Sequence, residues 1–191
     1  MTEKQNTLGA ATLARVAAFA ALIAALGLPG SLNLFGNAVP LTFQTLGVML
    51  AGAILGSRRG ALAVLVLVLL VAAGLPLLAG GRGGLGVFAG PSVGFLLGWI
   101  PGAFVTGWIV ERGGKAPGIA RLILACAAGG IGVVYLFGVP AQALVAGLPL
   151  GKAALLSSAF LPGDLLKAVV AAFVAHGVRR AYPAAAPGRD R

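Results

Sequence analysis

The chain contains a run of twenty residues without a single charge, ALAVLVLVLLVAAGLPLLAG, from Ala61 to Gly80. About 20 consecutive apolar residues are what an α-helix needs to cross the hydrocarbon core of a bilayer. The rest of the chain is similar, since 59% of its 191 residues are hydrophobic and 9% are charged, and the mean hydropathy is +1.02. A soluble domain of this size keeps many polar residues on its large surface. The sequence therefore predicts one all-α integral membrane domain.

Apolar segments of roughly this length recur along the chain. They predict six transmembrane helices, at about residues 10–28, 41–56, 60–79, 92–110, 118–138 and 153–178. Helices are expected to end or unwind at glycines and prolines, namely at Pro29, Pro76, the run 80–84, Pro91, Pro140 and Pro162–Gly163. The transmembrane domain is expected to span residues 1–182, and the Ala/Pro-rich segment 183–191 is expected to be a disordered cytoplasmic tail.

The positive charges indicate the orientation of these helices. With six spans, both termini lie on one face, and that face also receives Arg58, Arg59, Arg112 and Arg121, whereas Arg82 and Lys152 fall on the other. Cytoplasmic loops carry an excess of Lys and Arg, so both termini are expected to be cytoplasmic. The formal net charge of +10 is then a topology signal rather than a sign of nucleic-acid binding.

The loops on the opposite face, at residues 29–40, 79–91 and 139–151, are rich in Gly, Pro and apolar residues and carry Arg82 as their charge. Irregular backbone at membrane depth is tolerated where it is buried in protein or lines a cavity. We therefore expect these loops to fold over a site that is open to the outside.

Asp164 and Lys167 lie three residues apart in the apolar stretch AFLPGDLLKAVVAAFV. An ionisable residue inside a membrane segment is costly, and it often marks a functional site. On a helix the two side chains share a face, so they can pair with one another or present both charges to one cavity. Two interpretations remain: a self-neutralising helix cap, or a site for a polar ligand that carries both a hydrogen-bond donor and an anionic group.

Two further positions are candidate ligand contacts. The loop GGRGGLG at residues 80–86 places Arg82 and Gly83 in a Gly-rich backbone that can approach an anion closely, or that simply packs tightly over the domain. Gln44 is an amide at the start of an apolar run and needs hydrogen-bond partners, from either the protein or a ligand.

The sequence offers no grouping typical of an enzyme. The nearest match to a nucleotide-binding loop, AGLPLGKA from Ala146 to Ala153, has Ala where the first Gly and the final Ser or Thr are required. With one His and one Cys, the chain presents neither a metal-ligand cluster nor a catalytic triad. We therefore expect no catalytic activity, no metal and no cofactor.

The first apolar segment carries small residues at every fourth position, Ala10, Ala14 and Ala18, with a neighbouring row at Ala17, Ala21 and Ala25. Such rows let membrane helices approach closely, either within the chain or with another membrane subunit. Trp108 and Tyr182, with Trp99 as a further candidate, are expected to anchor helix ends at the membrane interface, and Tyr135 is expected near an outer helix end.

Three stretches, in this order, resemble the BioY family: VPLTFQTLGVMLAGAILGSRRGALA, GLPLLAGGRGGLGVFAGPSVGFLLGW and FLPGDLLKAVVAA. BioY proteins are the biotin-binding S components of energy-coupling-factor (ECF) transporters. The resemblance covers about residues 10–182 and implies a multi-pass protein of the bacterial inner (plasma) membrane that captures biotin at its outer face.

The resemblance also implies the site and the partners. Gln44, Arg82, Gly83, Asp164 and Lys167 would bind the transported biotin, with Asp164 accepting from the ureido ring and Lys167 or Arg82 neutralising the carboxylate. The partners would be a membrane coupling subunit (T component) and two cytoplasmic ATPases. The Ala face at residues 10, 14 and 18 would be a candidate docking surface for them.

Two residues depart from the pattern of the BioY family. Arg82 is a cation where related sequences can carry a neutral residue, and Phe95 stands where an aromatic hydroxyl is common.

Two other hypotheses for the function remain open. One alternative is a stand-alone proton-coupled carrier in which Asp164 titrates. The other is an assembly protein in which the charges only cap a helix.

Overall fold

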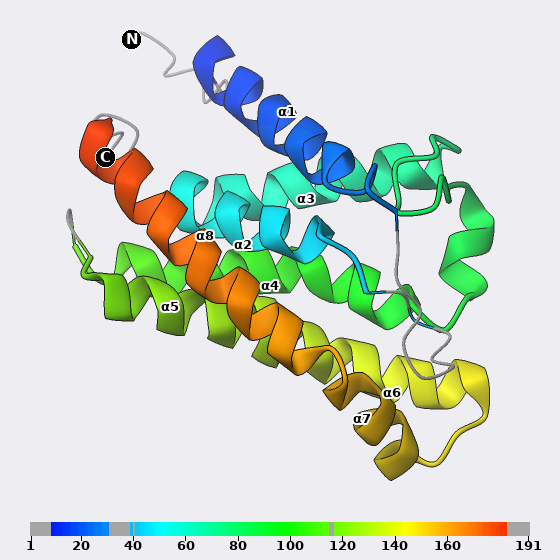
Figure 1. The fold of residues 1–191 in the computed structure, drawn as a ribbon. Helices are drawn as coiled ribbons and strands as arrows, with labels where there is room; N and C mark the ends of the chain where they lie inside the picture. Colours follow the sequence, from blue (N-terminus) through cyan, green and yellow to red (C-terminus); the bar gives the residue numbers. More distant parts are fainter. Residues whose placement is uncertain (1–8, 31–38, 40, 115–116, 183–191) are drawn as a thin grey trace, which may run out of the picture.

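The apolar segments fold into helices that lie side by side in a bundle (Figure 1). The structure is a computed structural model and describes residues 9–30, 39, 41–114 and 117–182. The α-helices of this part are α1 (Ala10–Ala25), α2 (Gln44–Leu55), α3 (Ser57–Ala72), α4 (Val93–Glu111), α5 (Ile119–Ala127), α6 (Val134–Ala146), α7 (Leu150–Ser158) and α8 (Leu161–Ala181). A short 3₁₀-helix, η1 (Leu85–Ala89), precedes α4, and a π-helix, η2 (Ala128–Val133), joins α5 to α6.

Three of the described helical stretches are long and apolar enough to cross a membrane: Val93–Glu111, Ile119–Ala146 and Leu161–Ala181. Helices α1 and α2 are apolar but shorter. Successive long helices run in alternate directions, so the start of α1, the α2–α3 turn, the α4–α5 connection and the end of α8 lie at one end of the bundle (Figure 1). We call this the basic end, because Arg58, Arg59, Arg112, Arg121 and Arg180 belong to these segments.

Helix α4 lies at the centre of the bundle and packs against α2, α3 and α6. Small residues make this possible: a Cβ atom added at Gly52 of α2 would collide with the Ala103 carbonyl of α4, and one at Gly107 would collide with the α2–α3 turn. Helix α8 packs on α2 and α5, and α1 packs on α3 and α2. The arrangement leaves α8 and α2, which carry the candidate polar residues, in direct contact.

The expected break at Pro140 is wrong. Helix α6 continues through Pro140 to Ala146, and α7 begins at Leu150, so most of the expected loop 139–151 is helical. Proline removes a single backbone donor, and membrane helices tolerate this where neighbouring groups or local adjustment satisfy the freed carbonyl. Pro101 likewise lies inside α4.

The last apolar segment forms two helices rather than one, because α7 ends at Ser158 and α8 begins at Leu161. Pro162 occupies the first turn of α8, where its missing N–H costs nothing. The third segment is also shorter than expected, since α3 ends at Ala72 rather than near residue 79. The predicted tail at residues 183–191 lies outside the described residues.

The segment between α3 and η1 reverses direction in a tight turn. Leu78 and Arg82 form an antiparallel bridge in which each backbone N–H donates to the other's carbonyl, at 3.0 and 3.2 Å. Gly80 and Gly81, between them, have φ of +78° and +70°, which side chains rarely adopt. The Gly run therefore builds a turn that holds Arg82 at a fixed place beside the bundle.

Candidate ligand-binding site

A cavity opens near the start of α8, at the end of the bundle opposite the basic end, and its empty space, counted out to the mouth, is about 590 Å³. Its apolar walls come from Val39, Leu41, Leu78, Phe95, Leu96, Trp99, Val134 and Phe160. Its polar groups come from Thr42, Gln44, Thr45, Arg82, Ser92, Tyr135, Asp164 and Lys167.

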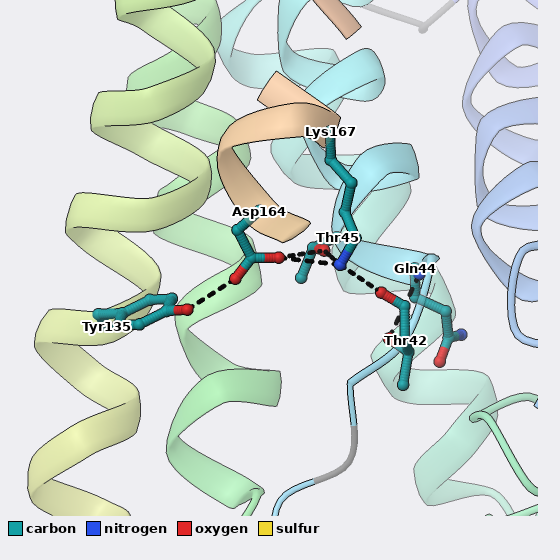
Figure 2. Close-up of polar contacts among 6 residues, drawn as sticks. All are labelled: Thr42, Gln44, Thr45, Tyr135, Asp164 and Lys167. Atoms are coloured by element: carbon teal, nitrogen blue, oxygen red, sulfur yellow. Dashed lines mark hydrogen bonds and ion pairs between the residues drawn. The ribbon is translucent and has the colours of Figure 1, made fainter. Parts of the chain in front are cut away.

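Asp164 and Lys167 form a buried ion pair in the wall of this cavity. The Lys167 Nζ donates to Asp164 Oδ1 at 2.8 Å, and the two side chains are 9% and 6% exposed. Lys167 also donates to the Thr42 carbonyl at 2.6 Å and to Thr45 Oγ1 at 3.2 Å. Figure 2 shows these contacts joining the N-terminal part of α8 to the start of α2. The pair is therefore more than a helix cap, because it reaches across to a second helix.

Tyr135 completes this network from α6. Its hydroxyl donates to Asp164 Oδ2 at 2.7 Å, while Thr45 Oγ1 donates to Oδ1 at 3.4 Å (Figure 2). The expectation that Tyr135 lies near an outer helix end is wrong, because the helical stretch continues from Ile119 to Ala146 and the Tyr135 side chain lies in the cavity wall. Trp99 is not an interfacial anchor, since it is buried beside the same cavity, whereas Trp108 and Tyr182 are exposed.

Gln44 is 1% exposed, and its amide bonds to backbone groups of two other segments. Nε2 donates to the carbonyls of Ile23 and Leu77 at 3.2 and 3.0 Å, and Oε1 accepts from the Ala79 N–H at 3.0 Å. Both donors of the amide are thus used by the protein. Gln44 ties α1, α2 and the loop before Arg82 together at the rim of the cavity.

Arg82 lines the cavity and is partly exposed. Within the described part of the chain it donates from Nε to the Ala79 carbonyl at 3.2 Å and from Nη1 to Ser92 Oγ at 3.4 Å. Both acceptors are neutral, so the guanidinium charge stays available to an anion. Gly83 is not part of the cavity wall, and a Cβ there would collide with the Leu75 carbonyl. Its observed environment is one of close backbone packing.

Four of the five residues singled out from the sequence therefore lie around one cavity. Sequence reasoning missed Thr42 and Thr45, although VPLTFQTLG places both beside Gln44. It also missed the contact of Tyr135 with Asp164, residues 29 positions apart. In the described residues no group of three or more His, Cys, Asp or Glu could hold a metal ion.

The cavity has a clear chemical character. One wall holds a buried acceptor and donor side by side, Asp164 and Lys167, and another part holds the cation of Arg82. Apolar and aromatic side chains form the remaining surface. Such a site suits a ligand with an amide-like polar end, an apolar middle and an anionic group.

Both rows of small residues on α1 face away from the bundle. Ala10, Ala14 and Ala18 are exposed, as are Ala17, Ala21 and Ala25, whereas the buried residues of α1 are Val16, Ala20 and Ile23. Packing of the Ala rows within the chain, one of the two expectations, is therefore wrong for the described residues. The rows form an outward face of the bundle.

Known proteins share both the sequence and the fold of this chain. The model of the BioY family matches residues 1–184. A biotin transporter BioY of Rhizobium etli is 53% identical over 90% of this chain and 94% of its own length, and one of Rhodobacter capsulatus is 50% identical over 87% and 92%. The crystal structure of the S component for biotin from an ECF-type ABC transporter superposes with a TM-score of 0.85 at 27% identity, covering 94% of this chain and 95% of the other. The chain belongs to the BioY family.

Proposed function

We propose that this chain is the biotin-binding membrane subunit, or S component, of an ECF-type vitamin uptake transporter. The observation that carries the proposal is the buried Asp164–Lys167 pair in the wall of a cavity that is otherwise lined mainly by apolar and aromatic side chains. Family membership and relatives named as biotin transporters support it.

The Asp164 carboxylate matches the N–H side of a cyclic urea. The ureido ring of biotin carries an N–H donor on each side of its C=O. Oδ1 of Asp164 already accepts from Lys167 and Thr45, whereas Oδ2 accepts from Tyr135 alone among the described residues. Oδ2 therefore has capacity to accept a ureido N–H as a charge-assisted hydrogen bond. We assign the ureido ring to Asp164, which Lys167 keeps ionised and in place.

Arg82 is then the partner of the biotin carboxylate. Lys167 is neutralised by Asp164 and already donates three hydrogen bonds, whereas the acceptors bonded to Arg82 are neutral. This favours Arg82 over Lys167, the two cations that the sequence left open for this role. The apolar wall from Phe95, Leu96 and Trp99 suits the ring sulfur and the aliphatic chain between the two polar ends.

A comparison of biotin with its methyl ester tests this orientation. The wild-type chain should prefer biotin over the ester, because the ester has lost the charge that pairs with Arg82. In the Arg82→Gln variant the preference should fall about tenfold, since hydrogen bonds to charged groups contribute about 1.5–3 kcal/mol. Lys152→Gln, at an exposed position of α7, is the matched control. An unchanged preference in Arg82→Gln would remove Arg82 from this role.

We propose six membrane spans with both termini in the cytoplasm: α1, α2, α3, α4, the continuous α5–η2–α6 rod and α8. The basic end would face the cytoplasm, in keeping with the positive-inside rule, and the cavity would open outward. A cysteine in place of Lys152 should react with a membrane-impermeant maleimide in whole cells, and one in place of Arg58 only after permeabilisation. The reverse pattern would overturn this orientation.

As the S component of a bacterial inner-membrane transporter, the chain would work with a membrane coupling subunit and two cytoplasmic ATPases. We propose that the coupling subunit docks on the face of Ala10, Ala14 and Ala18. The outward exposure of these residues supports this, because small residues allow close approach of membrane helices.

A further inference from the structure

Tyr135 of α6 contacts the charged pair on α8 through its hydroxyl, a contact that the sequence does not predict. Its ring meets the Phe95 ring edge to face, with centroids 5.7 Å apart and planes at 82°. Gly138, one turn further along α6, leaves the space that Phe95 fills, since a Cβ there would collide with the Phe95 ring. The hydroxyl of Tyr135 is thereby held toward Asp164 (Figure 2).

The hydrogen bonds of Asp164 are divided unequally between its two oxygens. Oδ1 accepts from Lys167 and Thr45, whereas Oδ2 accepts from Tyr135. A carboxylate offers about four acceptor positions, so the free capacity lies mainly on Oδ2. The Asp χ2 torsion has a broad, roughly two-fold profile, and a donor on Oδ1 alone would let the carboxylate turn about its axis.

We infer that Tyr135 is a positioning residue for ligand recognition: its hydroxyl fixes the plane of the Asp164 carboxylate so that Oδ2 accepts a ligand N–H. The inference rests on the proposed function, because the N–H belongs to the cyclic urea of the ligand. Since the Tyr135 proton is committed to Asp164, the phenol oxygen facing the cavity can only accept. The site then selects ligands with N–H donors at this position and disfavours those that carry a methyl group or an acceptor there.

Tyr135→Phe tests this role because it removes the hydroxyl and keeps the ring that packs on Phe95. The affinity for biotin should fall about tenfold, the typical effect of losing a hydrogen bond to a charged group. Tyr182→Phe, the same change at the other tyrosine of the chain, which is 69% exposed, should bind biotin as the wild type does.

A ligand comparison separates positioning from general packing. The wild type should prefer biotin over a derivative with a methyl group on a ureido nitrogen, and Tyr135→Phe should lose most of that preference. Unchanged biotin affinity in Tyr135→Phe, or an equal loss for both ligands, would overturn the inference. Failure of the wild-type chain to bind biotin would instead overturn the proposed function.

A spectroscopic measurement covers the case in which Tyr135→Phe does not fold. In the Tyr182→Phe protein, Tyr135 is the remaining tyrosine, so the tyrosine Raman doublet reports on its hydroxyl alone. The doublet should show a strong hydrogen-bond donor both before and after biotin is added. A hydroxyl that stops donating in the biotin-bound protein would contradict a positioning role.

Discussion

At the scale of single residues, two side chains with similar placement beside the cavity have different tasks. Gln44 uses its amide to hold three backbone groups, and Arg82 keeps its charge available while bonded to neutral acceptors. Gln44 is 1% exposed, whereas Arg82 is partly exposed. Substitutions at the two positions should therefore affect different measured quantities.

Gln44→Leu should lower the stability of the ligand-free protein. The change leaves the Ala79 N–H and the Ile23 and Leu77 carbonyls without their partner, and each buried polar group left unpaired costs about 1–3 kcal/mol. The measurement is thermal unfolding in detergent without biotin, with Arg82→Gln as the comparison. Arg82→Gln should unfold close to the wild-type temperature. A Gln44→Leu protein with wild-type stability would show that the hydrogen bonds of the Gln44 amide do not stabilise the fold.

At the scale of the helix, the π-helix η2 sets which residues of α6 face the cavity. A π-helix contains an extra residue relative to an α-helix and is frequent near functional sites. Gly130 makes room for the side chain of Met49, and Gly129 for Thr106 and the Gly102 carbonyl. These close contacts hold η2 against α2 and α4, and they fix the register in which Tyr135 reaches Asp164.

Insertion of one alanine between Val133 and Val134 should therefore impair biotin binding. The π-helix η2 already accommodates one extra residue, so at 3.6 residues per turn a further residue turns the following part of the rod by about 100°. Tyr135 would then leave the cavity wall or strain the helix. Gly132→Ala is the matched control, because the nearest atom to an added Cβ is the Ala127 carbonyl oxygen at 3.9 Å. Equal biotin affinity of the insertion and the control, measured by titration, would contradict this register argument.

The outward face of α1 gives a second prediction at this scale. Ala14→Leu should reduce biotin uptake by the assembled transporter, because the added side chain keeps the two helices apart. Biotin binding by the isolated chain should not change, since Ala14 points away from the bundle. Val174→Phe, at a position of α8 that is 43% exposed, is the control. Normal uptake by cells carrying Ala14→Leu would exclude this face as the docking surface.

At the scale of the whole molecule, the sequence predicts the class of fold well, since apolar length and composition determine where helices form. The predictions from sequence fail where tertiary contacts override a local sequence signal. Pro140 does not end α6, and Trp99 is buried rather than interfacial. Local rules weigh a proline or a tryptophan by its neighbours in sequence, whereas the packing of α6 against α4 decides their environment.

The sequence identifies those site residues whose burial in an apolar helix costs much free energy. A buried charge in an apolar helix stands out from sequence alone, and Asp164 and Lys167 do lie beside the cavity. Tyr135 and Thr45 could not be found in this way, because a hydroxyl is unremarkable in an apolar segment. Their contacts with residues 29 and 119 positions away depend on helix register and packing.

The binding of biotin to the purified chain and to its Asp164→Asn variant tests the central claim, that the buried pair is the recognition site for biotin. Asn keeps the size of the side chain but removes the charge that pairs with Lys167 and accepts the ureido N–H. We predict that the wild type binds biotin and that Asp164→Asn binds it at least about tenfold more weakly, while its ligand-free protein still folds. A wild-type chain that does not bind biotin, or a variant with undiminished affinity, would contradict it.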